Sequence, residues 1–383
     1  MRVMISCGEP SGDLYAGALA EEILRQEPSA ALVGFGGDRL AAAGATLIEN
    51  FSGLSVTGLL EVVRVLPRTY ATYRRLVADA VATPPDVFVA VDFPDFNFTL
   101  ARALKKQGIP IVYYISPQLW AWRSGRMQTM KRIADRVLVI FPFEEQIYRD
   151  AGVPVEWVGH PLLDLTPPSQ SRDAFLRGVG LDPQRPVLAL LPGSRGNELR
   201  MILPDLARAA VLIRKQVPDV QFLVARAPHL DDRLFEPLGL LEEDGASAVV
   251  LPASADDVLR AADAAVVASG TVTVQAALHE CPMVVVYRLS SLTYRLGKPF
   301  VHVNTYAMAN LVAGKRVVPE LIQDAFSPES VAREAVRMLT DEAYVEGMRD
   351  ELHAVKGKLG DRGASRRAAR AVLEVARTSK RVQ

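Results

Sequence analysis

The chain has 383 residues, 49% of them hydrophobic, and its 44 Lys and Arg residues balance its 44 Asp and Glu residues. This length predicts two or three domains, and the balanced charge argues against a general nucleic-acid binder. The two cysteines, Cys7 and Cys281, are far apart and lack metal-site spacing, which indicates buried, reduced thiols in a cytosolic protein. The sequence opens on a predicted strand rather than a signal peptide. No apolar run reaches the roughly 18 residues that span a membrane.

Apolar runs alternate with helical patterns through the first part of the chain. Predicted strands at residues 2–6, 86–91 and 109–116 alternate with predicted helices at residues 13–24 and 96–108. Strands that are apolar at every position, and that alternate with helices, are typical of parallel sheets covered on both faces.

A second set of the same kind begins near Pro186. Its predicted strands are residues 186–194, 220–226, 247–252, 264–271 and 282–288. Between the sets, a segment rich in Pro and Ser at about residues 160–172 predicts a linker. We therefore expect an α/β protein with two Rossmann-like, doubly wound domains, residues 1–165 and 166–349, facing each other across a cleft. Ligands are expected outside the carboxyl ends of the strands.

Two turns in the second set have the composition of phosphate sites. Each follows a predicted strand, exposes backbone N–H groups through a glycine and precedes a helix N-terminus, and one adds an arginine. Taken alone, each turn is equally typical of a simple tight turn, but two in one domain favour a diphosphate held from two sides. The residues concerned are Gly193, Ser194, Arg195, Ser269, Gly270 and Thr271.

Carboxylates follow two predicted strands of the first set. Asp92 comes directly after a buried strand, and Asp95, beside a proline and before a helix, is predicted to be an N-cap. Asp92 has no such structural duty, so it is the better candidate for a general base. Glu9 follows the first strand near Ser11 and Asp13, which look like capping residues. A structural and a functional role for Glu9 both stay open.

Other familiar motifs are weak or missing. Residues 34–44 contain a glycine-rich turn, but its spacing departs from that of dinucleotide-binding loops. The sequence contains no G-x-x-x-x-G-K-[ST], H-E-x-x-H, C-x-x-C or D-x-D motif, and we expect neither a cofactor nor a metal. His160, near the linker, is interpreted as a loop residue rather than as part of the cleft, and His279 as a surface or satisfied core residue.

Residues 58–81 have an amphipathic helical pattern. The apolar positions include Leu59, Val62, Val63 and Leu66, and the opposite side carries Arg64 and Arg68. Pro67 is expected to start a second helix within this segment. The pattern favours an ordinary helix packed on its sheet, and the alternative is an apolar, basic-rimmed surface for lipid.

A series of stretches from residue 8 to about residue 315 together resembles the lipid-A-disaccharide synthase family, glycosyltransferase family 19. They include GEPSGD, PDVFVAVDFPDFN, YISPQLWAWR, LPGSRGNE, ASGTVTVQAAL and NLVAG. The resemblance implies a glycosyltransferase B fold in which the second domain mainly holds the nucleotide. It also implies a last helix, at about residues 350–383, that packs back on the first domain.

The resemblance further implies a reaction. UDP-2,3-diacylglucosamine is joined to 2,3-diacylglucosamine 1-phosphate with inversion, which gives a β-1,6 disaccharide and UDP. Asp92 would be the base for the acceptor 6-hydroxyl, and Glu9 would assist on the acceptor side. No metal is needed if the UDP contacts and a helix N-terminus stabilise the leaving diphosphate. The implied UDP contacts are Gly193, Ser194, Arg195, Ser269, Gly270, Thr271, Gln275 and Asn310.

Both implied substrates carry acyl chains that stay in the bilayer. The resemblance therefore implies a peripheral protein on the cytoplasmic face of the inner membrane, and it favours the lipid surface for residues 58–81. A homodimer stays open.

Gln275 departs from the family, which usually has Glu there to hold the ribose hydroxyls. An amide offers one acceptor and a donor group, so we expect Gln275 to meet both hydroxyls and Gln275→Glu to tighten UDP binding. Two other functions stay open. One is another enzyme of this fold that uses UDP-N-acetylglucosamine, such as a 2-epimerase or the muramyl-pathway transferase. The other is a degenerate homologue that binds acylated sugar without turnover.

Overall fold

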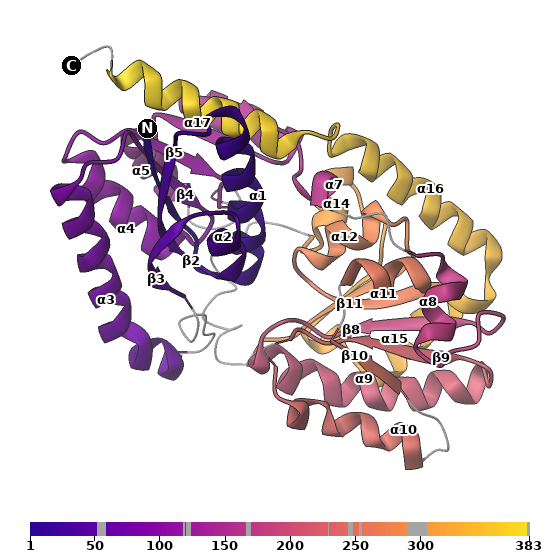
Figure 1. The fold of residues 1–383 in the computed structure, drawn as a ribbon. Coiled ribbons are helices and arrows are strands. Elements are labelled where there is room, and N and C mark those ends of the chain that lie inside the picture. Colours follow the sequence, from indigo (N-terminus) through magenta and orange to yellow (C-terminus); the bar gives the residue numbers. More distant parts are fainter. Residues whose placement is uncertain are drawn as a thin grey trace. The chain divides into compact units, whose positions relative to one another are not determined.

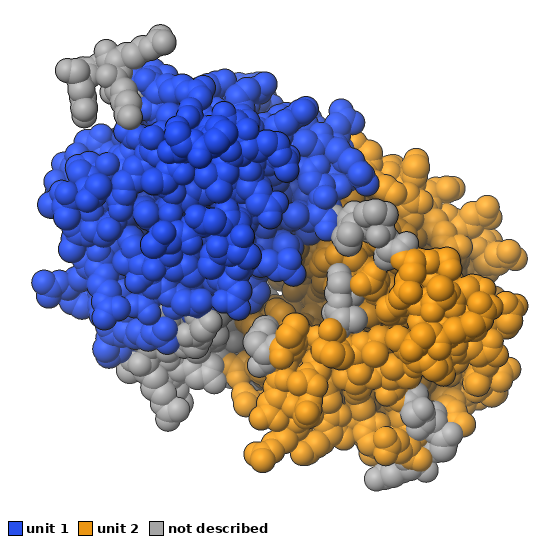
Figure 2. Space-filling view, in the orientation of Figure 1, with its two compact units in different colours: residues 1–165, 359–383 blue, residues 166–358 orange. Residues whose placement is uncertain are grey.

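The computed structural model describes residues 1–51, 59–117, 119, 124–165, 170–228, 230–243, 248–252, 255–289 and 305–380. The chain divides into two compact units, shown in different colours in Figure 2. The first unit combines Met1–Leu165 with Leu359–Gln383, and the second is Thr166–Lys358. Each unit is built on one parallel sheet, which confirms the predicted α/β class.

The sheet of the first unit has seven parallel strands in the order β3-β2-β1-β4-β5-β6-β7. Helices α3, α4 and α5 cover one face, and α1 and α17 pack together on the other (Figure 1). The strands are β1 (Arg2–Ser6), β2 (Ala31–Gly36), β3 (Thr46–Asn50), β4 (Val87–Val91), β5 (Ile111–Tyr114), β6 (Arg136–Val139) and β7 (Val155–Trp157). The helices are α1 (Pro10–Gln26), α2 (Asp38–Ala42), α3 (Leu59–Ala82), α4 (Pro94–Lys105), η1 (Ser124–Arg126), α5 (Met127–Ile133), α6 (Pro142–Asp150), α7 (Leu162–Leu165) and α17 (Ala364–Lys380).

The sheet of the second unit has six parallel strands in the order β10-β9-β8-β11-β12-β13. Helices α9 and α15 pack together on one face, and α11 and α12 lie side by side on the other. The strands are β8 (Val187–Leu191), β9 (Gln221–Ala225), β10 (Ala248–Leu251), β11 (Ala264–Ala268), β12 (Met283–Tyr287) and β13 (Glu320–Ile322). The helices are α8 (Arg172–Gly178), α9 (Gly196–Gln216), η2 (Asp232–Leu238), α10 (Gly239–Glu243), α11 (Ala255–Ala261), α12 (Val272–Leu278), α14 (Met308–Ala313), η4 (Gln323–Ala325), α15 (Pro328–Thr340) and α16 (Glu342–Lys358).

Burial explains why the strands could be recognised in the sequence. Every residue of β4, β8 and β11 is buried, so these strands must be apolar at every position. Four helices, α1, α4, α6 and α15, start with proline in the first turn, where its fixed φ fits and its missing N–H costs nothing.

Pro67 does not start a second helix, so this prediction is wrong. The helix α3 continues through Pro67 from Leu59 to Ala82. An interior proline removes one helical hydrogen bond. Pro67 lies on the exposed side of α3, where water can hydrate the carbonyl group that loses its partner.

The predicted C-terminal helix at about residues 350–383 is two helices. Helix α16 ends at Lys358 in the second unit, and α17 packs on α1 in the first. The side chain of Asp164 fixes the start of α17, because its carboxylate accepts backbone hydrogen bonds from Gly363 at 2.6 Å and Ser365 at 3.3 Å. The chain thus returns to the first unit at Leu359, later than the sequence indicated.

Candidate functional site

The strand order of the first sheet reverses at β1 and β4, which lie side by side with Ser6 opposite Ala90. Parallel α/β sheets bind ligands at such a switch point, outside the carboxyl ends of the strands. Glu9 follows β1 and Asp92 follows β4. The fold therefore brings both predicted acidic residues to the same edge of one sheet.

The backbone at Asp92 has an uncommon conformation. Asp92 and Phe93 have φ angles of 46° and 47°, in the left-handed region that residues other than glycine rarely adopt. Such residues cost roughly 1–3 kcal/mol each and persist where the surroundings hold them. The carbonyl of Asp92 accepts hydrogen bonds from the Asn97 amide at 2.8 Å and the Tyr113 hydroxyl at 2.9 Å. A Cβ atom at Gly8 would lie 2.3 Å from the Phe93 ring, so only glycine fits there.

Asn97 joins the ends of β1 and β4 from inside the unit. Its side chain is fully buried, and its oxygen accepts from the Ser6 hydroxyl at 2.6 Å. Its amide nitrogen donates to the carbonyls of Ser6 and Val91 as well as Asp92. Burial, with the nearby charge of Asp92, raises the pKa of Tyr113 well above its usual range, so the phenol stays a neutral donor.

Three acidic residues near this edge lie at or near helix starts, and each makes different contacts. Asp95 is not the predicted N-cap, because α4 begins at Pro94 and places Asp95 in its first turn, where it pairs with Arg126. Glu9 occupies the N-cap position of α1, but its side chain makes no capping hydrogen bond.

Asp13 caps a different helix, because its buried carboxylate accepts from the N–H groups of Gly37, Arg39 and Leu40 at the start of α2. The glycine-rich turn at residues 34–44 therefore already holds an anion of its own chain.

His160 is a loop residue, as predicted. It is 1% exposed between the rings of Tyr15 and Phe141, and its Nδ1 accepts from the backbone N–H of Leu162 at 3.2 Å. Burial lowers the pKa of His160 to about 3, so the ring is neutral at physiological pH.

The second sheet reverses its strand order at β8 and β11, where Leu191 lies opposite Val267. The predicted turn at residues 193–195 follows β8, and the turn at residues 269–271 follows β11. Both candidate phosphate turns therefore lie at one switch point of this sheet.

The turn after β8 is closed by Glu198, which the sequence analysis missed. Its carboxylate accepts from the backbone N–H of Ser194 at 3.2 Å and pairs with Arg195 at 3.1 Å. Gly193 has a φ of 121°, and a Cβ atom there would lie 2.5 Å from Glu198 Oε2. Burial and the charge of Glu198 raise the pKa of Tyr287, at the end of β12. The donors predicted to bind phosphate thus surround an anion of the chain itself.

The turn after β11 is tied to the segment before α14. Ser269 Oγ donates to the carbonyl of Tyr306 at 3.1 Å, and the carboxylate of Glu320 accepts from the N–H groups of Tyr306 and Ala307. Thr273 Oγ1 donates to the carbonyl of Gly270 at 2.8 Å. Thr271 itself is exposed and makes no side-chain cap for α12.

Asn310 has a structural role in this geometry. It is 1% exposed, its oxygen accepts from the N–H groups of Val317 and Val318, and its amide donates to Val318 O and Glu320 Oε1. These four hydrogen bonds use the full capacity of an Asn side chain. In the observed conformation the Asn310 side chain is fully used within the chain, and the UDP contact implied by the resemblance stays a prediction.

Gln275 lies one turn along α12 from Thr271, but its amide nitrogen donates to Asp256 Oδ2 at 3.1 Å. His279 Nε2 lies 2.9 Å from Asp256 Oδ1. His279 is therefore the satisfied residue that the sequence predicted.

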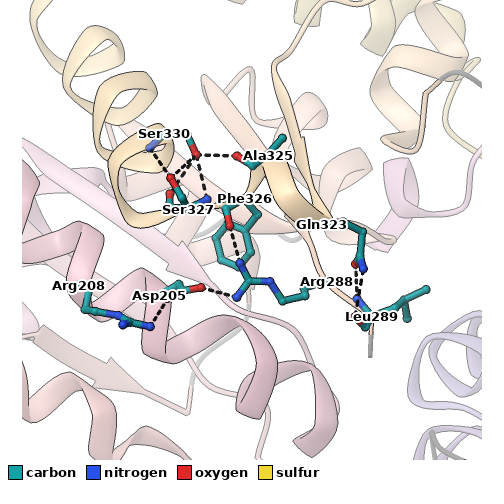
Figure 3. A network of polar contacts seen from close by, with 9 residues as sticks. All are labelled: Asp205, Arg208, Arg288, Leu289, Gln323, Ala325, Phe326, Ser327 and Ser330. Carbon is teal, nitrogen blue, oxygen red and sulfur yellow. Dashed lines mark hydrogen bonds and ion pairs between the residues drawn. The ribbon is translucent and has the colours of Figure 1, made fainter. Parts of the chain in front are cut away.

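A polar network holds the end of β12 beside this edge (Figure 3). Arg288, directly after β12, pairs with the buried Asp205 of α9, donates to the Phe326 carbonyl and lies 4.5 Å from the centre of its ring. The Gln323 side chain accepts from Leu289 N and donates to Leu289 O. Since α9 also begins in the turn after β8, the network links the two strand ends.

Comparison with known proteins gives the family. A sequence model of the family described as lipid-A-disaccharide synthetase matches residues 3–375. The chain belongs to this family. It is 44% identical to the lipid-A-disaccharide synthase of Geobacter sulfurreducens over 377 residues, which cover 98% of this chain and 97% of that one. It is 42% identical to the lipid-A-disaccharide synthase of Myxococcus xanthus over 374 residues, which cover 98% and 97%.

Solved structures confirm the fold of this family member. A UDP-GlcNAc 2-epimerase from Neisseria meningitidis superposes with a TM-score of 0.67 at 12% identity, covering 98% of this chain and 100% of that chain. The kitacinnamycin glycotransferase superposes with a TM-score of 0.65 at 19% identity, covering 98% of each. These similarities confirm the glycosyltransferase B class of fold.

The described part of α3, where a lipid surface was predicted, carries both packed and exposed apolar side chains. Tyr73 and Val77 pack against the core of the first unit, whereas Leu66 and Tyr70 are 52% and 62% exposed. Arg68 pairs with Glu49 of β3. The side chains of Leu59, Val62, Val63 and Arg64 lie outside the described residues. Within the described part of the chain, no helix is both long and apolar enough to cross a membrane.

Proposed function

We propose that the protein transfers 2,3-diacylglucosamine from UDP to the 6-hydroxyl of 2,3-diacylglucosamine 1-phosphate with inversion, forming a β-1,6 disaccharide and UDP. Membership of the lipid-A-disaccharide synthetase family supports lipid A disaccharide synthesis. The observation that carries the finer proposal is the placement of the site residues. The acidic candidates follow the switch-point strands of the first sheet, and the two candidate phosphate turns follow the switch-point strands of the second.

Asp92 is proposed as the general base. A carboxylate takes the proton of the attacking hydroxyl while the anomeric carbon–phosphate oxygen bond breaks, so one displacement needs one base. The strained backbone at Asp92, fixed by Asn97 and Tyr113, supports this role because strain persists where a fixed geometry is needed. Glu9 is proposed to assist on the acceptor side of the same edge.

UDP is proposed to bind at the switch point of the second sheet. Backbone N–H groups of both turns, the N-termini of α9 and α12, and the Arg195 guanidinium would stabilise the charge that develops on the leaving diphosphate. These groups supply that stabilisation without a metal. Gln275 is proposed to meet the ribose. Because Glu198 now holds Ser194 and Arg195, it must give up these donors when the diphosphate binds.

The acyl chains of both substrates are proposed to stay in the bilayer. We propose that the protein binds the cytoplasmic face of the inner membrane through the first turns of α3. The exposed apolar side chains of Leu66 and Tyr70 support this contact.

The decisive experiment incubates the purified protein with UDP-2,3-diacylglucosamine and 2,3-diacylglucosamine 1-phosphate and follows the disaccharide and its anomeric coupling by mass spectrometry and NMR. Asp92→Asn should lower turnover by about 10²–10⁴-fold without unfolding the protein. Asp95→Asn, three residues away in an exposed ion pair, is the matched control and should keep its activity. Turnover of UDP-N-acetylglucosamine instead would indicate a different enzyme, and substrate binding without product would indicate a degenerate homologue.

A further inference from the structure

Asp256 lies at the centre of a small polar cluster between two neighbouring helices of the second unit. It is in the first turn of α11 and only 7% exposed. Its Oδ2 atom lies 3.1 Å from Gln275 Nε2, and its Oδ1 atom lies 2.9 Å from His279 Nε2. Gln275 lies in α12 and His279 is the C-cap of that helix, four residues later, so both side chains lie on one face.

The chemistry of the carboxylate fixes the orientation of both partners. An ionised carboxylate only accepts hydrogen bonds, so the atom of Gln275 that faces Asp256 must be its NH₂ group. The amide oxygen of Gln275 must therefore point away from Asp256. By the same argument, the His279 nitrogen that faces Asp256 carries a proton.

Within the described residues, the Gln275 oxygen has no hydrogen-bond partner, and Gln275 lies one turn from the exposed Thr271. We propose that Asp256 is a positioning residue that holds Gln275 with its amide oxygen toward the ribose of the bound nucleotide. This inference rests on the proposed UDP site. A ribose hydroxyl then donates to Gln275, and the amide donor is not available to the ligand. This differs from the expectation that Gln275 uses both groups.

The arrangement reverses the expected effect of Gln275→Glu. A carboxylate at this position would face Asp256 at about 3 Å, and two like charges so close cannot both stay ionised and in place. The variant should therefore bind UDP more weakly than the wild type. Combining Gln275→Glu with Asp256→Asn restores a donor–acceptor pair, because the amide introduced at position 256 can donate to the carboxylate introduced at position 275.

Calorimetric titrations with UDP, 2′-deoxy-UDP and 3′-deoxy-UDP test the proposal. The wild type should bind UDP about 3- to 10-fold more tightly than at least one deoxy analogue, as expected for one hydrogen bond. Gln275→Ala and Asp256→Ala should each remove this discrimination, Asp256→Asn should reduce it, and the double variant Asp256→Asn, Gln275→Glu should restore it. Asp257→Asn, the next residue on α11, is the matched control and should discriminate like the wild type.

Each outcome decides one point. Full ribose discrimination in folded Asp256→Ala or Asp256→Asn would overturn the positioning role and leave the UDP site intact. Tighter UDP binding by Gln275→Glu alone would overturn it as well. A wild type that fails to bind UDP would overturn the proposed function and this inference together. A purely structural role for Asp256 would lower thermal stability but would leave the ratio of UDP to deoxy-UDP affinities unchanged.

Discussion

Replacing His160 with Asn should make the first unit less sensitive to acid. In the wild type, burial lowers the pKa of His160 from 6.5 in an unfolded chain to about 3. The unfolded chain therefore binds an extra proton between these pH values, and the folded state loses stability as the pH falls below 6.5. The Asn oxygen can still accept the Leu162 hydrogen bond that Nδ1 accepts now, but it does not titrate.

The magnitude follows from the size of the shift. The proton linkage costs the wild type roughly 1.4 kcal/mol per pH unit, which amounts to about 2 kcal/mol at pH 5 and about 3 kcal/mol at pH 4. His160→Asn loses ring contacts with Tyr15 and Phe141, which should cost roughly 2 kcal/mol at pH 8. The variant should therefore be less stable than the wild type at pH 8, equal near pH 5 and more stable at pH 4.

Urea unfolding followed by tryptophan fluorescence measures this difference. All three tryptophans fall within residues 1–165, so the signal reports on the unit that contains His160. Other titrating groups are common to both proteins and cancel in the difference. Phe141→Leu is the control, because it removes ring packing without removing a titrating group and should keep the wild-type pH profile. Parallel profiles for His160→Asn and the wild type from pH 8 to pH 4 would refute the reasoning.

Three further substitutions test the second unit. Arg195→Ala should weaken UDP binding by roughly 1.5–3 kcal/mol if the guanidinium contacts the diphosphate, and calorimetry would show an unchanged affinity if it does not. Glu198→Gln should tighten UDP binding about 2- to 10-fold because it removes a charge that competes for Ser194 and Arg195, and weaker binding would contradict that competition. Asn310→Leu should lower the stability of the second unit by roughly 2–5 kcal/mol, because it leaves the buried polar groups around Asn310 without hydrogen-bond partners. A thermal melt by circular dichroism that matches the wild type would contradict the structural role of Asn310.

The sheets could be predicted because each central strand carries its own signal. A strand buried on both faces must be apolar at every residue, as β4, β8 and β11 are. The course of α3 through Pro67 could not be predicted, because a proline is found both at helix starts and at interior positions on an exposed helix face. The split between α16 and α17 falls at two glycines with left-handed φ, Gly360 and Gly363, but the start of α17 is also held by Asp164, about 200 residues earlier in the sequence. No local pattern reports such a contact.

The site could be predicted as a set of positions but not as a set of contacts. The carboxyl ends of the strands at each switch point follow from the topology, and Asp92 and Arg195 lie there. The sequence does not show which side chain each polar group contacts in the folded chain. The sequence does not show that the Asn310 side chain makes four hydrogen bonds within the folded chain. Asp256 looks like an ordinary helix-start acid until Gln275 is placed against it.

The contacts of the site are hard to predict for one physical reason. Carboxylates of the chain itself accept hydrogen bonds from N–H groups at helix starts. Asp13 does so for α2, Asp164 for α17 and Glu198 for the turn before α9. The positive end of a helix attracts any anion, so a glycine turn before a helix predicts an anion without saying whether it is a ligand or a side chain. The number of backbone donors and the exposure of the contacts separate the cases. Asp13 is 4% exposed and held by three backbone N–H groups, whereas Glu198 accepts one such bond and pairs with a partly exposed Arg195. If UDP binds as proposed, the negative charges of its diphosphate take the place of the Glu198 carboxylate on Ser194 and Arg195, whereas three backbone hydrogen bonds keep Asp13 in its place.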